Sequence, residues 1–545
     1  MNKKKIAFNL LVLLAITFGI LFGLKVSFVN GDDAFLSIMM EGRYGTGLNR
    51  QIFAFIGPVF GIIEGLISPL MVHLNVYICT IIGLYFLAAF NTCLAAEITG
   101  SKWQLQVLSY LLYAFSLLNI NFTSLTVYLM ASALILAYTL DRSDIGEKRG
   151  ARSALLVIIF ISVLFAGSLR MSLAVFVLFF ITLFMLIDFK DNKHFNYLIS
   201  SGMLFVVLAV NYAVRSLVLR MHPDWAEYFK WHNTVAGFVD FPDTDYNKYK
   251  DLFDAVGWSQ NDVDMLNNWS FYDLDVFTTD KMEYVLDRIP LYEHYCTNIK
   301  VLIRNMLNTR AVVIAIAAFI IALCIVAINK EKIGKRVFEI IVFFIPFAII
   351  MGGLAIRQRI YPHVYLPFLG LLLFEVLLYL DNSKAKYSYL FTAFAAVIIV
   401  VFGIGRITDF AGIDYKSIEY GEYVTANSDQ TFIVDNSVKK YFKEDCPPII
   451  HMSKYSNPDN LVSMADFDAA SPRDAYKLEL AGIKDPTKPY VSLLEDDTYF
   501  ISKDDSKKLG YLEQYFKEHF SKDIIIETVH DFGLDSGIKV YRFTY

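Results

Sequence analysis

The chain has 545 residues, of which 56% are hydrophobic and only 19% are charged, and its formal net charge at pH 7 is -5. Soluble domains average about 45–50% apolar and about 25% charged residues, so the composition does not fit an ordinary soluble protein. The small net charge also gives no sign of the basic surface of a nucleic-acid-binding protein, and we expect no nucleic acid among the partners.

The apolar residues are gathered into runs of roughly 16–25 residues, the length that crosses about 30 Å of hydrocarbon as a helix. The first run follows MNKKK and is too long for the apolar core of a cleaved signal peptide, so we expect it to be retained as a span. Eleven spans are expected in all, at residues 6–29, 70–94, 104–119, 122–140, 154–169, 172–188, 197–219, 311–328, 337–356, 364–380 and 388–408.

Basic residues fall in alternate loops between these spans, which by the positive-inside rule places the N-terminus inside and, with eleven spans, the C-terminus outside. The inner set is Lys3, Lys4, Lys5, Lys102, Arg142, Lys148, Arg149, Arg152, Lys190, Lys193, Lys330, Lys332, Lys335, Arg336, Lys384 and Lys386.

Three longer segments are then expected on the outer side: residues 30–69, 220–310 and about 412–545. In the first, residues 51–67 are apolar but interrupted by glycine, proline and glutamate, which favours a helix lying at the interface. The second is expected to be folded and helical. In the tail we expect strands in 430–438, 447–455 and 490–502, a helix at 506–520, and a closing hairpin from 524–532 and 538–545.

The predicted fold is therefore mainly α. A polytopic transmembrane helical bundle (residues 1–411) carries a small extracytoplasmic α+β domain (residues 412–545) in the cell membrane. Of the five cysteines, Cys296 and Cys446 would both face outward, and the sequence leaves open whether they form a disulfide.

Two adjacent carboxylates, Asp32 and Asp33, stand at the outer mouth of the first span. Such a pair raises the pKa of one member or recruits a cation, so both are candidates for catalysis and for holding a divalent metal such as Mg²⁺ or Mn²⁺. The alternative is a helix N-cap, which Asp33 could supply alone. A cap does not explain the polar cluster that follows, Glu41, Arg43, Tyr44 and Arg50, of which the last three are candidate substrate-binding residues.

Arginines near the outer ends of later spans are also candidates. Arg170 lies in the short turn between spans five and six, and Arg215 lies at the end of span seven. Either could bind an anionic substrate, or could reach the lipid headgroups, as arginines at span ends often do.

The strongest signal is RQRIYPHVYLP, between spans nine and ten. Arg357 and Arg359 lie on the side that the charge bias disfavours, and Pro362 predicts an irregular backbone, which at this depth is expected where it lines a cavity. With His363 beside them, the two guanidinium groups suit a phosphate clamp. Binding of lipid headgroups without catalysis is the alternative.

A polytopic chain with acids directly after the first span, an interfacial helix behind them and an outer C-terminal domain resembles the GT-C glycosyltransferase superfamily. GDDAFLSIMMEGRYGTG and residues 257–284 are also similar to segments of uncharacterised multi-spanning proteins of Gram-positive bacteria. The resemblance implies a polyprenyl-phosphate-linked sugar donor. It also implies catalysis by Asp32 or Asp33, as base or metal contact, and a lipid phosphate held by Arg357 and Arg359.

The function we expect is transfer of a sugar from that donor to a cell-envelope glycan or other acceptor on the outer face. A transporter or flippase of a lipid-linked saccharide is the first alternative. It should carry charges at mid-membrane and inverted repeats, whereas the inner halves of the spans are almost free of charge. A non-enzymatic envelope protein, or transfer of a phosphoglycerol or acyl group, also stays open.

Overall fold

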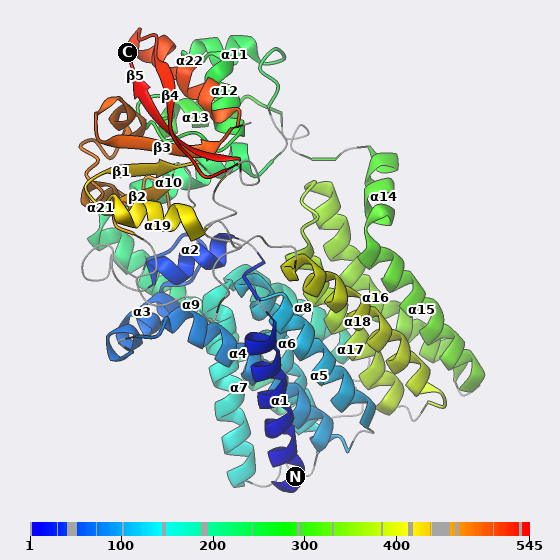
Figure 1. Cartoon of the computed structure of the whole chain (residues 1–545). Coiled ribbons are helices and arrows are strands. Elements are labelled where there is room, and N and C mark those ends of the chain that lie inside the picture. Colours follow the sequence, from blue (N-terminus) through cyan, green and yellow to red (C-terminus); the bar gives the residue numbers. More distant parts are fainter. Residues whose placement is uncertain are drawn as a thin grey trace.

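A computed structural model describes most of the chain. The described residues are 3–24, 26–29, 31–40, 52–71, 73–100, 103–143, 149–186, 194–241, 244–290, 295–296, 298–329, 332–382, 385–411, 418–435, 438, 449, 458–463, 468–504, 506–533 and 537–545. Helices dominate, and one small sheet lies near the C-terminus (Figure 1).

Long apolar helices form the lower part of the molecule, which we call the bundle. They are α1 (Lys3–Gly23), α4 (Val76–Ile98), α5 (Trp103–Leu118), α6 (Phe122–Asp141), α7 (Arg149–Leu169), α8 (Met171–Leu186), α9 (Phe195–Met221), α15 (Arg310–Asn329), α16 (Ile333–Ile356), α17 (Pro362–Asn382) and α18 (Ser388–Ala411). In the described part of the chain, nine of them are long and apolar enough to cross a membrane, and α5 and α8 are shorter. These helices indicate a membrane protein; the count of eleven spans stays a prediction.

Two expected spans extend six residues beyond the helices that the structure shows. The first helix ends at Gly23 and not at residue 29, because Val26 and Phe28 are buried and the chain here bonds to other segments: Val29 N–H donates to Ile120 O, and Ile449 N–H donates to Val26 O. The second long helix begins at Val76 and not at residue 70, because the side chain of Asn75 caps it by accepting from Ile78 N.

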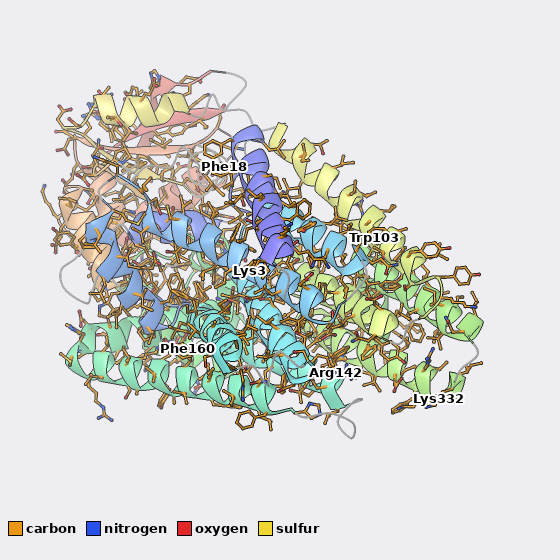
Figure 2. The ribbon with its side chains drawn as sticks, turned by 90° about the horizontal axis from the view of Figure 1, so that it is seen from below. Lys3, Phe18, Trp103, Arg142, Phe160 and Lys332 are labelled. Carbon is orange, nitrogen blue, oxygen red and sulfur yellow. The ribbon has the colours of Figure 1, made fainter. Side chains whose placement is uncertain are left out.

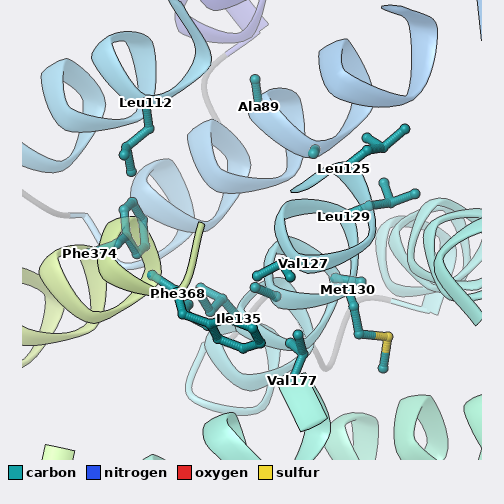
Figure 3. Packing of buried hydrophobic residues seen from close by; sticks show 14 of the residues in the cluster. Ala89, Leu112, Leu125, Val127, Leu129, Met130, Ile135, Val177, Phe368 and Phe374 are labelled. Carbon is teal, nitrogen blue, oxygen red and sulfur yellow. The ribbon is translucent and has the colours of Figure 1, made fainter. Parts of the chain in front are cut away.

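Helix α6 is the centre of the bundle. Of its most apolar 18 residues, 94% are buried. Figure 3 shows Leu125, Leu129 and Ile135 of α6 among side chains of its neighbours, with Ala89 from α4 and Phe374 from α17. Because α6 is covered on all sides, packing fixes its position. The N-terminus of α6, at Phe122, is therefore fixed as well.

The outer surface of the bundle is apolar, and its lower end is basic. Phe18, Trp103 and Phe160 are exposed, as expected for side chains that meet lipid. Lys3 and Lys332 lie at helix ends on the face that Figure 2 views from below. This arrangement of charge and apolar surface suits a membrane-embedded bundle.

Short elements run across the upper end of the bundle. They are α2 (Gly31–Met39), α3 (Pro58–Ile67) and the 3₁₀ turn η2 (Ser68–Leu70). Residues 52–57, which we call the strap, lead into α3 and end at Gly57, whose N–H donates to Ser168 O at 2.6 Å. The short apolar α3, with Leu66 and Leu70 exposed, is consistent with the helix expected to lie at the interface.

Above the bundle lies a second part that we call the head, made of the described residues within 223–290 and 418–545. Its helical elements are α10 (Pro223–Val239), α11 (Lys250–Ala255), α12 (Gln260–Asn267), α13 (Thr279–Leu286), α19 (Ile418–Ala426), α21 (Pro472–Leu480), η8 (Pro489–Leu494) and α22 (Lys508–Phe520). Helix α14 (Ile299–Asn308) then leads into α15. The described residues of the segment 220–310 are thus largely helical, as expected.

The head holds a five-stranded mixed sheet in the order β2-β1-β3-β5-β4. The strands are β1 (Thr431–Val434), β2 (Leu461–Ser463), β3 (Thr498–Lys503), β4 (Ile525–Asp531) and β5 (Ile538–Thr544); β2, β1 and β3 are parallel, and β5 is antiparallel to β3 and β4. The closing hairpin and the helix before it are confirmed. The strand expected at 490–502 is half wrong, since 489–494 form a 3₁₀ turn, and all of 447–455 except Ile449 lies outside the described residues.

One hydrophobic core joins the two segments of the head. Trp225, Trp258 and Met265 from the middle of the chain pack in the same cluster as Phe500 and Phe516 from the tail. The tail therefore depends on the middle segment for part of its core. The division of the chain at residue 411 stays a prediction.

Gly57 offers a test of how the strap is seated. A Cβ there would lie 2.4 Å from Asn211 Oδ1 and 2.8 Å from Ser168 O, whereas at Gly83 in α4 it would meet nothing within 4 Å. We expect Gly57→Ala to lower the free energy of unfolding by about 1–3 kcal/mol, because the strap must move away from α7 and α9. Gly83→Ala should not lower it. Unfolding of both purified variants in detergent checks this, and equal stabilities would contradict it.

Candidate functional site: a charged cluster between bundle and head

Asp33 is a buried structural carboxylate. It is fully shielded from solvent, and its Oδ1 accepts from Tyr77 Oη (2.7 Å) and Phe122 N (2.9 Å) while its Oδ2 accepts from Asn121 Nδ2 (2.8 Å). Asn121 in turn caps α6 by accepting from Thr123 N and Ser124 N. The oxygens of a carboxyl group at a helix N-terminus accept hydrogen bonds from N–H groups that have no partner within the helix. Asp33 thus caps α6 and not its own helix.

Asp32 lies in the same first turn of α2. It is half-buried, and its charge favours the charged form of Arg170. Arg170 links α7 and α8, with its guanidinium over the rings of Phe55 (5.1 Å) and Phe122 (5.5 Å). Burial lowers the pKa of Arg170, and the nearby charge of Asp32 opposes that shift. The two adjacent aspartates therefore have different roles. Asp33 holds α2 against α6, and the charge of Asp32 acts on Arg170.

Arg359 lies at the irregular start of α17 and pairs with the head. Its guanidinium donates from NH1 to Asp240 Oδ2 (3.0 Å) and from NH2 to Asp240 Oδ1 (2.9 Å), a bidentate fork. Asp240 is the C-cap of α10. Gln358, one residue before, has a φ of 57°, which turns the chain sharply between α16 and α17. Arg359 also acts electrostatically on Arg170, so the two guanidinium groups are neighbours.

Helix α10 adds an uncharged imidazole to this region. His232 is packed against Phe55 of the strap (ring centroids 5.4 Å apart) and Tyr228 (5.5 Å). Burial lowers the pKa of His232 to about 4, and the charge of Arg215 adds to this while that of Asp240 opposes it. Tyr228 and His232 are four residues apart and so lie on one face of α10, and the charge of Asp240 at its C-cap also acts on His232.

His363 and Arg215 complete the set. The His363 ring stacks on Tyr361 (5.5 Å), the charges of Arg170 and Arg359 reach it, and its backbone oxygen accepts from Ser124 Oγ. The guanidinium of Arg215 lies 4.3 Å from the Phe229 ring. We call the following residues the charged cluster: Asp32, Arg170, Arg215, His232, Asp240, Arg359 and His363. With three arginines against two aspartates, it suits an anion.

The structure thus brings five of the sequence candidates into one region, Asp32, Arg170, Arg215, Arg359 and His363. Asp33 adjoins it but is sealed off. Arg357 is exposed at the end of α16, and no side-chain bond or ring contact is recorded for it among the described residues. Arg43, Tyr44 and Arg50, like Glu41 and Cys446, lie outside the described residues.

Sequence reasoning missed Asp240 and His232. Both lie in a segment rich in aromatic and acidic residues, where neither stands out, because their role depends on the face of α10 that meets the bundle. The four-residue spacing of Tyr228 and His232 was a signal that could have been used for His232.

The pair Asp32 and Asp33 does not make a metal site from the described residues. Both oxygens of Asp33 already accept hydrogen bonds, and within that part of the chain a group of three possible metal ligands occurs elsewhere, at Asp262, Glu518 and His519. Structural Mg²⁺ sites need several oxygen ligands in near-octahedral geometry. We therefore derive no step through a metal at this place.

By fold and site the chain is a multi-helix membrane protein with a charged cluster where its bundle meets its head. Comparisons with protein-family models, with curated proteins and with solved structures found no significant match.

Replacing Asp33 tests its structural role. Burial raises the pKa of Asp33 to about 8, so the folded state keeps the proton over a range in which the unfolded state has lost it. The stabilisation from Asp33 is then greatest at low pH and is lost as the pH rises toward 8. We expect Asp33→Asn to be less stable than the parent by about 1–3 kcal/mol at pH 5, with a smaller deficit at pH 8. Unfolding curves of both proteins at both pH values check this. A deficit of equal size at pH 5 and pH 8 would contradict it.

Proposed function

We propose that this protein is a membrane glycosyltransferase. It would move a sugar from a polyprenyl-phosphate-linked donor to a cell-envelope glycan or another acceptor on the outer face of the membrane. The observation that carries the proposal is that the charges of Asp32 and Arg359 both act on the guanidinium of Arg170, although the three residues come from distant parts of the chain. A half-buried acid among arginines at the upper end of an apolar bundle suits a substrate with a lipid tail and an anionic head.

Asp32 acts as the base. It takes the proton from the acceptor hydroxyl as the hydroxyl oxygen bonds to the sugar C1. The bond between C1 and the phosphate oxygen breaks at the same time, and the lipid phosphate leaves with that electron pair. Arg170 and Arg359 stabilise the leaving phosphate, which already carries charge and therefore needs cations more than a proton. Asp33 contributes by fixing the turn of α2 that bears Asp32.

The outer location rests on the distribution of charge. Lys3, Arg142 and Lys332 lie at helix ends on the lower face in Figure 2, and the head lies at the opposite end in Figure 1. By the positive-inside rule the lower end faces the cytoplasm, and the charged cluster and the head then lie outside.

A transporter of the same lipid-linked saccharide is the second candidate, and one observation favours it. Glu375 is buried in α17, in a bundle whose inner halves the sequence suggested were almost free of charge. Buried ionisable groups within spans often mark transport paths. Movement of a labelled glycolipid from one leaflet of a vesicle membrane to the other, without transfer of its sugar to an acceptor, would favour this candidate.

The transferase proposal is tested with radiolabelled polyprenyl-phosphate sugars added to membranes that contain the protein. We expect Asp32→Asn to lower the transfer rate by about 10²–10⁴-fold, as for loss of a general base. Arg170→Ala or Arg359→Ala should lower it by about 10²–10³-fold, as for loss of a group that stabilises the leaving charge.

Matched controls come from the head. Asp251→Asn in α11 and Arg288→Ala after α13 remove the same charges from exposed positions and should leave the rate unchanged. Full activity in Asp32→Asn, at equal expression, would move the base elsewhere. No transfer by the parent protein with any donor would remove the proposal.

A further inference from the structure

We propose that Asp240 occupies the anion-binding position of Arg359 in the resting protein, so that the phosphate of a lipid-linked substrate must displace it. Asp240 is thus an internal competitor and a latch between head and bundle. The inference rests on the proposed function, because it concerns the regulation of the same site.

The geometry of the pair carries the inference. The two carboxylate oxygens of Asp240 lie 3.0 Å and 2.9 Å from the two terminal nitrogens of Arg359. A phosphate presents two oxygens to a guanidinium in the same fork. Arg359 therefore cannot hold a phosphate in this way while Asp240 is seated. The arginine expected from the sequence to be an open clamp is filled by a residue of the chain itself.

Asp240 is poorly supported by its own helix. It caps the C-terminus of the 17-residue α10, where the helix dipole presents negative charge. A carboxylate there is disfavoured, unlike Asp33 at the N-terminus of α6. In the part of the chain that the structure describes, the hydrogen bonds of the Asp240 carboxylate go to Arg359. An arriving anion therefore competes with one ion pair and not with a network.

The pair is open to exchange. The side chains of Arg359 and Asp240 are 32% and 33% exposed, so water and ions reach both. By contrast the pair of Arg473 and Asp468, within the head, is 1% exposed on each side. Partly exposed ion pairs contribute little net stability, so the phosphate of a substrate can compete with the Asp240 carboxylate for the guanidinium.

A second arginine near Asp240 makes it easier for the Asp240 carboxylate to leave Arg359. Arg170 lies within electrostatic reach of both Asp240 and Arg359. His232, eight residues earlier in α10, stays neutral because burial keeps its pKa low, so it does not compete for the carboxylate. When a phosphate binds Arg359, the Asp240 carboxylate can remain near Arg170 or turn to solvent.

Displacement would also change how the head sits. Asp240 belongs to α10 of the head, and Arg359 belongs to the turn that starts α17 of the bundle. Breaking the fork removes one tie between the two parts beside the charged cluster. Binding of the anionic substrate would then weaken the contact between head and bundle beside the charged cluster, where the acceptor has to enter.

A double-mutant cycle tests the latch without any sugar transfer. The probe is farnesyl phosphate, and its affinity is measured for the full-length protein in lipid nanodiscs. We expect Asp240→Asn to bind the probe roughly three- to tenfold more tightly than the parent, because the competing charge is gone. Asp240→Glu, which keeps the charge, should bind it no more tightly than the parent. In an Arg359→Ala background, Asp240→Asn should give no gain.

Each other outcome overturns the proposal. Equal gains in both backgrounds would mean that Asp240 repels anions generally and does not fill the place on Arg359. Weaker binding by Asp240→Asn would mean that Asp240 only positions Arg359, and no binding by any variant would mean that Arg359 holds no phosphate. A cycle with the expected pattern in a protein that transfers no sugar would keep the latch and remove the transferase. Sugar transfer by a protein in which the effects of Asp240→Asn and Arg359→Ala on probe binding simply add would keep the transferase and remove the latch.

Discussion

The arrangement of the site depends on one buried carboxylate. Asp33 ties α2 to the start of α6 and to Tyr77 of α4, and α6 is itself held on all sides by the bundle. A carboxylate in such a place is costly unless its oxygens are bonded, and here they accept three hydrogen bonds. Because the bonds leave Asp33 little freedom, the preceding residue has little freedom either. Asp32, in the same first turn of α2, is thereby held where its charge acts on Arg170.

A second contact fixes the other side of the site. Arg473 of the tail is buried, pairs with Asp468, and lies over Phe53 of the strap (4.3 Å) and near Trp225 of α10 (5.6 Å). It therefore joins all three segments expected to lie outside the membrane. The strap passes from this contact to Phe55, between Arg170 and His232, and then to the tight seat of Gly57. The charged cluster is thus enclosed by parts that are distant in sequence and held by different forces.

The bundle could largely be predicted from sequence, because span length and apolar composition are local properties that depend on the thickness of a bilayer. The sheet of the head was predicted less well, since short strands such as β2 are defined by pairing with partners far along the chain. At the site, Asp32, Arg170 and Arg359 stood out because charge near apolar runs is unusual. The pairing of Arg359 with Asp240 and the burial of Asp33 could not be predicted, because both depend on how α10 and α6 approach other segments. The same limit explains why two adjacent acids looked alike in the sequence and differ in the structure.

The most direct test of the account is whether Asp32 and Arg170 interact. The free energy of unfolding in detergent is measured for the parent, Asp32→Asn, Arg170→Gln and the double variant. If the two charges face each other, the single effects should fail to add by about 0.5 kcal/mol or more. Effects that add to within about 0.3 kcal/mol would place the acid and the arginine in separate surroundings, and the proposed site would lose its base.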